Sequence, residues 1–459
     1  MKYRRKSYVF FFFDEYNETN ENNIEYHYLS QFNKFGIDDK SEQVKFYDSS
    51  GLLKKKDTKD QTDEEFQVID FKRLISEKVR KIIYGEKYSN IVFLAGAGAS
   101  VVGNNLKYGK TVRMIAEDIF EKLPKEDDVY SLEELAKQCQ YHNGDILKSE
   151  EDGTDELRDS FNLEDFLSAL FHYRPFVIDD NKIKFENSIK AILKMIKENT
   201  NYSYNNKFLK HGSLLNFLSR LSGKNGNKFS VVTTNYDVLI EQAAADNNFI
   251  VFDGFNFTPN PKFDSSMFEW NLVKEVQNIN TREVEYKDKV FNLLKIHGSL
   301  TWEKEDNGDI LRKNKDIIDD TDKMVMIFPS SDKYAQSYQE PYFELFSKFQ
   351  ELLKRPNTLL ISSGFSFADA HIAKIVTQSL KNNSSLRLLV TDYNIDPNRA
   401  WNKDIGAFED ILEDDSRFNQ NWSELVSLMN EGYPVTFLKA TMNDDLVDYL
   451  DGRYLDSED

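Results

Sequence analysis

Glycines and small polar residues follow an apolar run near residue 90. The segment "NIVFLAGAGASVVG" places Gly96, Ala97, Gly98 and Ser100 directly after that run. A strand that enters a glycine-rich turn and then a helix presents backbone N–H groups at the helix start, where the helix dipole favours an anion. The segment therefore predicts either a phosphate-binding turn or a closely packed corner, and it lacks the third glycine of the dehydrogenase pattern.

Two later segments carry side chains suited to hydrolytic chemistry. "VVTTNYD" contains Thr234, Asn235 and Asp237, and "LLKIHGSLTW" contains His297 and Gly298. The amide of Asn235 can both donate and accept hydrogen bonds, so it can position a water molecule. A histidine such as His297 can act as a general base near neutral pH. Each segment also has a simpler explanation, because Asp237 can cap the helix that follows and a His-Gly pair can form a turn.

The composition restricts the class of protein. With 40% hydrophobic and 14% aromatic residues, the chain of 459 residues can fill the core of two or three domains, or of one large α/β domain with insertions. A net charge of -19 disfavours direct nucleic-acid binding over the whole surface. Because no apolar stretch approaches a membrane span and no signal-peptide pattern begins the chain, we expect a cytoplasmic protein. Cys139 is the only cysteine, so we expect no metal.

The distribution of apolar runs predicts an α/β fold with a Rossmann-like parallel sheet. Residues 1–69 form an N-terminal extension of strands or hairpins that is partly irregular, and residues 70–455 form the main domain. Within that domain, amphipathic patterns predict a large helical insertion at about 104–221. Short continuous apolar runs between helices are typical of parallel strands covered on both faces. We expect such strands at "FSVVTTNYD", "VFNLLKIHG", "KMVMIFP", "NTLLISSGFS", "LRLLVTDYN" and "YPVTFLKAT".

Four segments occur in an order that resembles the sirtuin-like NAD-consuming proteins of bacterial antiphage defence. Those proteins carry a "GAGxS" turn, a "T[TQ]N[YI]D" segment, an "HG" pair and a "GxS" turn. This chain has "GAGAS" at 96–100, "TTNYD" at 233–237, "HG" at 297–298 and "GFS" at 364–366. "GFSFADAHI" and "MIFPSSDKY" are also similar to segments of that branch, and the similarity extends over about 71–450.

The resemblance implies that NAD is the substrate. The backbone of residues 96–100 would hold its pyrophosphate, Gly364 and Ser366 would approach the adenosine half, and Asn235 and His297 would face the nicotinamide ribose as the catalytic pair. The residues expected to bind NAD are Gly96, Ala97, Gly98, Ser100, Thr234, Asp237, Gly298, Gly364 and Ser366.

Three functions are compatible with this resemblance. The first is an NAD glycohydrolase that depletes NAD in abortive infection. The second is a protein deacylase or ADP-ribosyltransferase, but deacylating sirtuins carry a zinc ribbon of paired cysteines, which Cys139 alone cannot form. They also follow the glycine turn with Gly-Ile-Pro and an arginine, whereas this chain has no proline there and a displaced Arg113. The third is a non-catalytic sensor of NAD or ADP-ribose.

Two further histidines need assignment. A second "HGS" begins at His211, but it lies in the helical pattern that precedes "TTNYD", so His297 is the expected base. His371, beside Asp369, could cap the helix after the last glycine turn or contact the nucleotide.

Partners are expected on two grounds. The apolar segment "YVFFFF" at 8–13 would be an aggregation hazard if exposed, so it either packs on its own domain or contacts another subunit. We expect a homo-oligomer, and the resemblance implies a larger complex with a HerA-like ATPase.

Overall fold

The computed structural model describes residues 24–38, 44–53, 55–56, 63–64, 67–103, 105–149, 155–158, 160–178, 181–223, 226–276, 283–314, 323–326, 340–402, 407–415 and 417–456. The segment at 8–13, for which a packed or subunit-contacting strand is predicted, lies outside these residues. Most of "MIFPSSDKY" also lies outside them.

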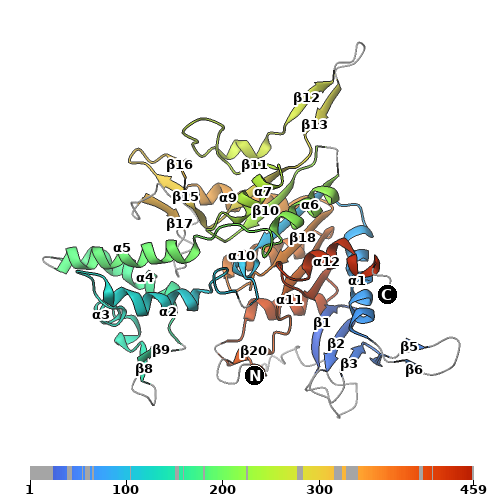
Figure 1. The fold of residues 1–459 in the computed structure, drawn as a ribbon, viewed down its shortest axis with the longest axis horizontal. Coiled ribbons are helices and arrows are strands. Elements are labelled where there is room, and N and C mark those ends of the chain that lie inside the picture. The colour runs from blue at the N-terminus through green and yellow to red at the C-terminus, as the bar shows by residue number, and fades with distance from the viewer. Residues whose placement is uncertain are drawn as a thin grey trace, which may run out of the picture.

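A single large sheet forms the centre of the described part of the chain (Figure 1). In spatial order its strands are β11 (Ile250–Phe252), β14 (Val290–Lys295), β10 (Phe229–Thr233), β7 (Asn90–Ala95), β18 (Thr358–Ser363), β19 (Leu386–Asp392), β22 (Val435–Lys439), β1 (Glu25–Ser30), β2 (Lys34–Asp38), β3 (Lys45–Asp48) and β4 (Gly51–Leu52). The strands from β11 to β22 are parallel, and β1 to β4 continue the sheet as antiparallel strands. The predicted α/β fold with parallel core strands is confirmed.

The strand order is that of a doubly wound nucleotide-binding fold. The parallel part of the sheet begins at β7, adds β10 and β14 on one side, and then adds β18, β19 and β22 on the other. This is the order 3-2-1-4-5-6, with β11 added beyond β14. Ligands of such sheets bind at the carboxyl ends of the strands where the order reverses, which here is the crevice between β7 and β18.

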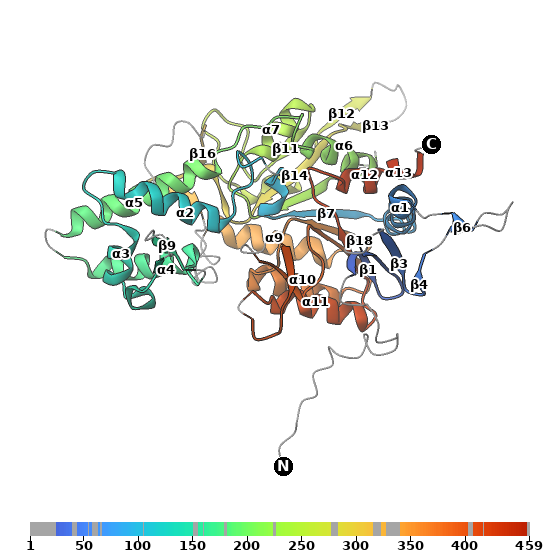
Figure 2. The ribbon, with the colours of Figure 1, turned by 60° about the horizontal axis from the view of Figure 1, so that its bottom comes forward.

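Helices cover both faces of the sheet (Figure 2). On one face lie α1 (Val68–Tyr84), α6 (His211–Ser222), α7 (Leu239–Asp246) and α12 (Leu446–Asp451), and on the other lie α9 (Tyr342–Lys354), α10 (Ala370–Asn382) and α11 (Gln420–Asn430). Alternate side chains of β7 enter the two cores, Ile91 and Phe93 on the first face and Val92 and Leu94 on the second. This alternation explains why β7 is apolar throughout.

The helical insertion has a hydrophobic core of its own. It comprises α2 (Val112–Lys122), α3 (Leu132–Gln138), the hairpin β8 (Leu147–Ser149) and β9 (Asp155–Leu157), α4 (Leu163–Tyr173) and α5 (Asn181–Thr200). Phe166 of α4 and Phe185 of α5 are fully buried in this core, which is separate from the two cores of the sheet. The insertion extends to one side of the sheet (Figures 1 and 2). The next helix, α6, packs on the sheet.

The prediction of a parallel strand at "KMVMIFP" is wrong. β17 (Met324–Met326) pairs antiparallel with β15 (Gly298–Lys304), which also pairs with β16 (Ile310–Arg312) in a small separate sheet. Gly298, with φ +90°, turns the chain out of the main sheet directly after β14, so β15 offers β17 a nearby partner. A short apolar run does not specify which strand it will pair with.

Shorter hairpins complete the described structure. They are β5 (Lys55–Lys56) with β6 (Asp63–Glu64), β12 (Val273–Val276) with β13 (Glu283–Tyr286), and β20 (Arg399–Asn402) with β21 (Ala407–Asp410), and a last helix α13 spans Arg453–Asp456. β12 and β13 project away from the sheet (Figure 1). No helix within the described ranges is long and apolar enough to cross a membrane.

Candidate functional site

The four predicted segments begin at one row of the sheet. Ala95 of β7 pairs with Thr233 of β10 on one side and with Ser363 of β18 on the other, and Thr233 pairs with Lys295 of β14. "GAGAS", "TNYD", "HG" and "GFS" each follow directly, or one residue later, beyond this row. The structure therefore brings all four segments to the carboxyl edge of the sheet, beside the crevice between β7 and β18.

The two glycine turns are packed against each other. A Cβ on Gly98 would lie 2.7 Å from the Cα of Gly364, and a Cβ on Gly96 would lie 2.5 Å from the Cα of Phe365. Gly364 has φ +60°, and a Cβ there would overlap the backbone of Gly98 and Ala99. Side chains at these positions would force the two turns apart, so the glycines are required for backbone packing whether or not a ligand is bound.

Most N–H groups of the first turn are used within the protein. The N–H of Gly96 donates to Ser363 O at 3.1 Å, and that of Gly98 donates to Gly364 O at 2.9 Å. The N–H of Ala99 donates to Gly96 O at 3.0 Å. Within the described residues the N–H of Ala97 has no acceptor, and Ala97 is exposed. Ala97 is therefore the position of this turn from which a backbone donor can reach a bound anion.

A chain of hydrogen bonds fixes Asn235 at the base of this turn. Its Nδ2 donates to Gly96 O and to Ser100 Oγ, both at 3.0 Å. Ser100 Oγ in turn donates to Asp237 Oδ2 at 2.8 Å, and both Ser100 and Asp237 are buried. The second oxygen of Asp237 accepts the N–H of Leu239 at 3.1 Å. Asp237 thus accepts the N–H of the first residue of α7, whose N-cap is Val238, and also orients Asn235 through Ser100.

Lys295 forms hydrogen bonds with the backbone of the same segment. This buried lysine, at the end of β14, donates through Nζ to the backbone carbonyls of Tyr236 and Asp237, and it pairs with Glu241 Oε1 at 2.9 Å. The carbonyl oxygens that follow Asn235 are therefore held in place by a charged donor.

His297 is buried beside a carboxylate. Its Nε2 lies 3.4 Å from Oδ2 of Asp369, and each of the two side chains is 8% exposed. Phe346 of α9 lies next to both His297 and His371, and its ring stacks on that of His371 at 4.6 Å. Burial lowers the pKa of His371, and Asp369 opposes this shift.

The remaining predicted residues lie around this centre. The N–H of Thr234 donates to Ala95 O at 3.2 Å, which ties β10 to β7 beyond the paired row. Gly298 makes the turn from β14 into β15. Ser366 is exposed, and its carbonyl accepts a hydrogen bond from Asn419 Nδ2 at 2.6 Å.

The two other histidines have different surroundings. His211 is 2% exposed at the start of α6, and burial lowers the pKa of its imidazole to about 4. It lies on the face of the sheet covered by α6, with its ring nearly perpendicular to that of Tyr204. His371 does not cap α10, because the cap is Asp369, whose Oδ1 accepts the backbone N–H groups of His371 and Ile372.

Sequence reasoning missed four residues of this region. Asp369 lies inside the quoted segment "GFSFADAHI", and Lys295 lies two residues before His297, so both could have been found by inspecting the flanks of the motifs. Asp392 ends β19 one position beyond the shared row, and burial raises the pKa of its carboxyl to about 6. Asn443 donates to the carbonyls of Ala99 and Val101, and no sequence pattern around Asn443 predicts this contact.

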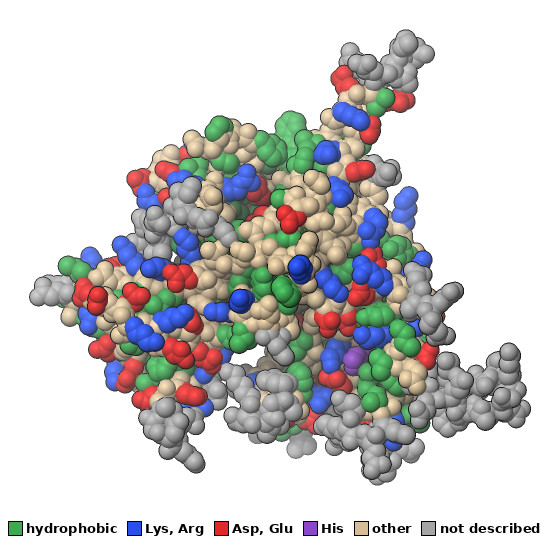
Figure 3. All heavy atoms as spheres, in the orientation of Figure 1, with side chains coloured by type: hydrophobic (Ala, Val, Ile, Leu, Met, Phe, Trp, Pro, Cys, Tyr) green, Lys and Arg blue, Asp and Glu red, His purple; other side chains and the backbone are tan. Residues whose placement is uncertain are grey.

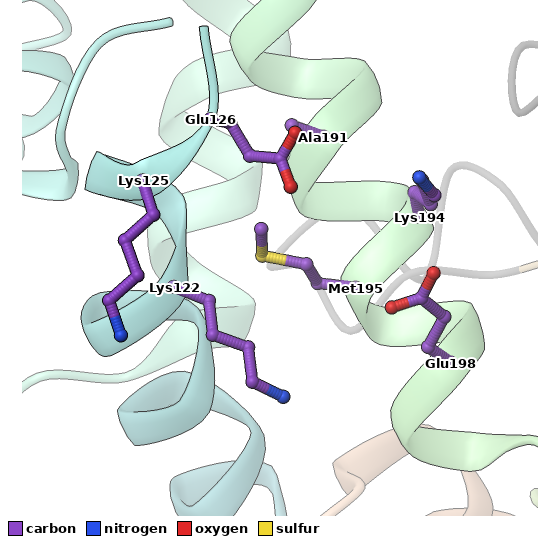
Figure 4. A pocket seen from close by; sticks show the side chains of 7 residues that line it. All are labelled: Lys122, Lys125, Glu126, Ala191, Lys194, Met195 and Glu198. Atoms are coloured by element: carbon purple, nitrogen blue, oxygen red, sulfur yellow. The ribbon is translucent and has the colours of Figure 1, made fainter.

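The insertion carries a separate groove between α2 and α5. Lys122, Lys125, Glu126, Lys194 and Glu198 line it with Ala191 and Met195, around a volume of about 220 Å³ (Figure 4). Its charges are of both signs, as on the surface of the insertion seen in Figure 3. The groove shares no residue with the four segments. Across the described ranges, no group of three or more His, Cys, Asp or Glu side chains is placed to hold a metal ion.

The strand order and the position of these segments are those of a doubly wound α/β fold, a class that binds ligands at this edge of the sheet. Residues 230–411 match the model of the SIR2-like domain family. This span contains Asn235, His297 and the second glycine turn, while the first glycine turn precedes it. No curated protein is similar enough to the chain to be matched. The chain therefore contains a SIR2-like domain, which implies an activity that uses NAD.

Proposed function

We propose that the protein is an NAD glycohydrolase that converts NAD and water to nicotinamide, ADP-ribose and a proton. The observation that carries this proposal is the fixed Asn235 amide at the same sheet edge as the buried His297. Both lie beside the crevice in which this fold class binds nucleotides.

The residues have distinct tasks in the proposed reaction. The bond between C1′ of the ribose and the nicotinamide nitrogen breaks, and its electron pair neutralises the pyridinium ring. The oxygen of a water molecule bonds to C1′, and His297 accepts the proton that this water releases. Asn235, held by Gly96 and Ser100, orients the water and the ribose hydroxyls through its amide oxygen.

The anion site is supported by fewer donors than the glycine pattern suggests. Ala97 is exposed, and its N–H is the donor that we assign to the pyrophosphate, while Gly98 and Gly364 keep the two turns close. Thr234, Asp237, Gly298 and Ser366 surround the same edge and complete the proposed NAD site.

The wider role is proposed on the resemblance alone. It includes NAD depletion in antiphage defence, assembly as a homo-oligomer and a complex with a HerA-like ATPase. Deacylation or ADP-ribosyl transfer is the alternative activity, and the single Cys139 disfavours it because a zinc ribbon needs paired cysteines. A sensor that only binds NAD would have no need of Asn235 and His297.

Incubation of the purified protein with NAD tests these alternatives directly. We expect free nicotinamide and ADP-ribose without any added peptide. Nicotinamide released only with an acyl-lysine peptide would support the deacylase, and NAD binding without turnover would support the sensor. Elemental analysis of the same sample is expected to find no stoichiometric zinc, and its presence would reopen the deacylase.

A further inference from the structure

Asp369 uses its two carboxylate oxygens differently. Oδ1 accepts the backbone N–H of His371 at 3.0 Å and that of Ile372 at 3.1 Å, which caps α10. Oδ2 is directed at another element and lies 3.4 Å from Nε2 of His297. A capping role accounts for Oδ1 but leaves the position of Oδ2 unexplained.

The buried surroundings strengthen the electrostatic interaction between Asp369 and His297. Both side chains are 8% exposed, and charges interact more strongly where water is excluded. The ring of Phe346 packs beside His297 and stacks on His371. Burial lowers the pKa of His371, which disfavours a second positive charge beside His297.

A carboxylate can only accept hydrogen bonds. A hydrogen bond to this carboxylate requires Nε2 of His297, the nitrogen that faces Asp369, to carry a hydrogen, and it leaves the lone pair on Nδ1. The separation of 3.4 Å exceeds a usual hydrogen bond, and catalytic hydrogen bonds are often this long in proteins without bound substrate.

We propose that Asp369 is a positioning residue that orients His297 and fixes its tautomer, so that Nδ1 accepts the proton during hydrolysis. This inference rests on the proposed function. Asp369 does not touch the substrate and keeps its own charge. Once His297 is protonated, the adjacent carboxylate stabilises the imidazolium.

Two substitutions separate positioning from helix capping. Asp369→Asn retains a capping oxygen but turns an NH₂ group toward His297, so Nε2 must accept and Nδ1 must carry the hydrogen. Asp369→Ser also retains a cap and removes the partner of His297 altogether. Ser131→Asn, which exchanges the cap of α3 in the insertion, is the matched control for a change of capping residue.

We expect kcat of Asp369→Asn to fall by roughly 100-fold or more with KM nearly unchanged, since a wrong tautomer disables the base. Asp369→Ser should lose less, about tenfold, because its imidazole still populates both tautomers. The ¹⁵N NMR shifts of the His297 ring should report hydrogen on Nε2 in the native protein and on Nδ1 in Asp369→Asn. The control should match the native protein in kcat.

The inference is overturned if Asp369→Asn matches the control in kcat, or if its His297 ring shows the native tautomer. If Asp369→Asn fails to fold, the ring shifts of Asp369→Ser decide. A positioning role predicts that His297 becomes a mixture of tautomers, whereas a role in capping alone predicts that the native tautomer is unchanged. Absence of NAD hydrolysis in the native protein would refute the proposed function, while the tautomer measurement would still judge the role of Asp369.

Discussion

The carboxyl edge of the sheet and the helical insertion use polar side chains in different ways. At the edge, Asn235 and Ser100 join segments that are 135 residues apart in the chain. In the insertion, many polar contacts are local, such as the Ser131–Glu134 capping box. The insertion holds its shape through an apolar core, whereas the edge holds specific atoms in place. Substitutions should therefore affect chemistry in the first region and stability in the second.

The largest effect is expected for the two catalytic residues. Asn235→Ala and His297→Ala should each lower kcat for NAD hydrolysis by roughly 10²- to 10⁴-fold, the usual contribution of a positioned acid–base group. Melting temperature and steady-state kinetics check this. Asn187→Ala, which deletes an amide from α5 of the insertion, is the control and should keep native kcat. Equal losses in all three variants would remove the distinction between the regions.

The core of the insertion should show the opposite behaviour. Phe166→Ala removes a fully buried ring and should cost about 3–5 kcal/mol. Because this core is separate from those of the sheet, hydrogen exchange should speed up in α2 to α5 while β7 and β18 stay protected. Uniform loss of protection across both regions would show that they unfold as one unit.

The contact between the glycine turns can be tested with a matched pair of glycines. Gly364 and Gly308 both have positive φ, but a Cβ on Gly308 would meet nothing within 4 Å. Gly308→Ala should cost only conformational strain, about 1–3 kcal/mol. Gly364→Ala should cost about 1–3 kcal/mol more, because the backbone of the facing turn must move. Denaturant titration of both variants measures the difference, and equal costs would mean that the turns separate freely.

The sequence was informative where a residue pattern matches a repeated geometry. Continuous apolar runs predicted the parallel strands, and the order of the glycine turns, Asn235 and His297 predicted that they share one edge. Contacts between distant segments were harder to predict. Asp369 lies in a quoted motif, but its contact with His297 depends on the tertiary fold, and Asn443 lies outside every motif. The same limit explains the error at β17, since the apolar residues Met324–Met326 indicate a buried strand without indicating its partner.

His211 and His297 each precede a Gly-Ser pair, but only His297 is assigned a catalytic role, so His211 is expected to affect stability instead. Burial lowers the pKa of His211 to about 4, below its value of 6.5 in the unfolded chain. The unfolded state therefore binds a proton between these values while the folded state does not, so stability falls as the pH falls through this window. Between pH 7 and pH 5 the loss due to His211 is about 2 kcal/mol.

His211→Leu should abolish that part of the pH dependence, because leucine does not titrate. Urea unfolding of the native protein and of His211→Leu at pH 7 and pH 5 measures it as the difference between the two stability changes. NAD hydrolysis at pH 7 should remain, since His211 is neutral there and is a buried residue of α6, outside the proposed catalytic pair. If a folded His211→Leu protein lost turnover while His297→Ala kept it, the general base would be His211. The assignment of His297 as the catalytic base at the sheet edge would then be wrong.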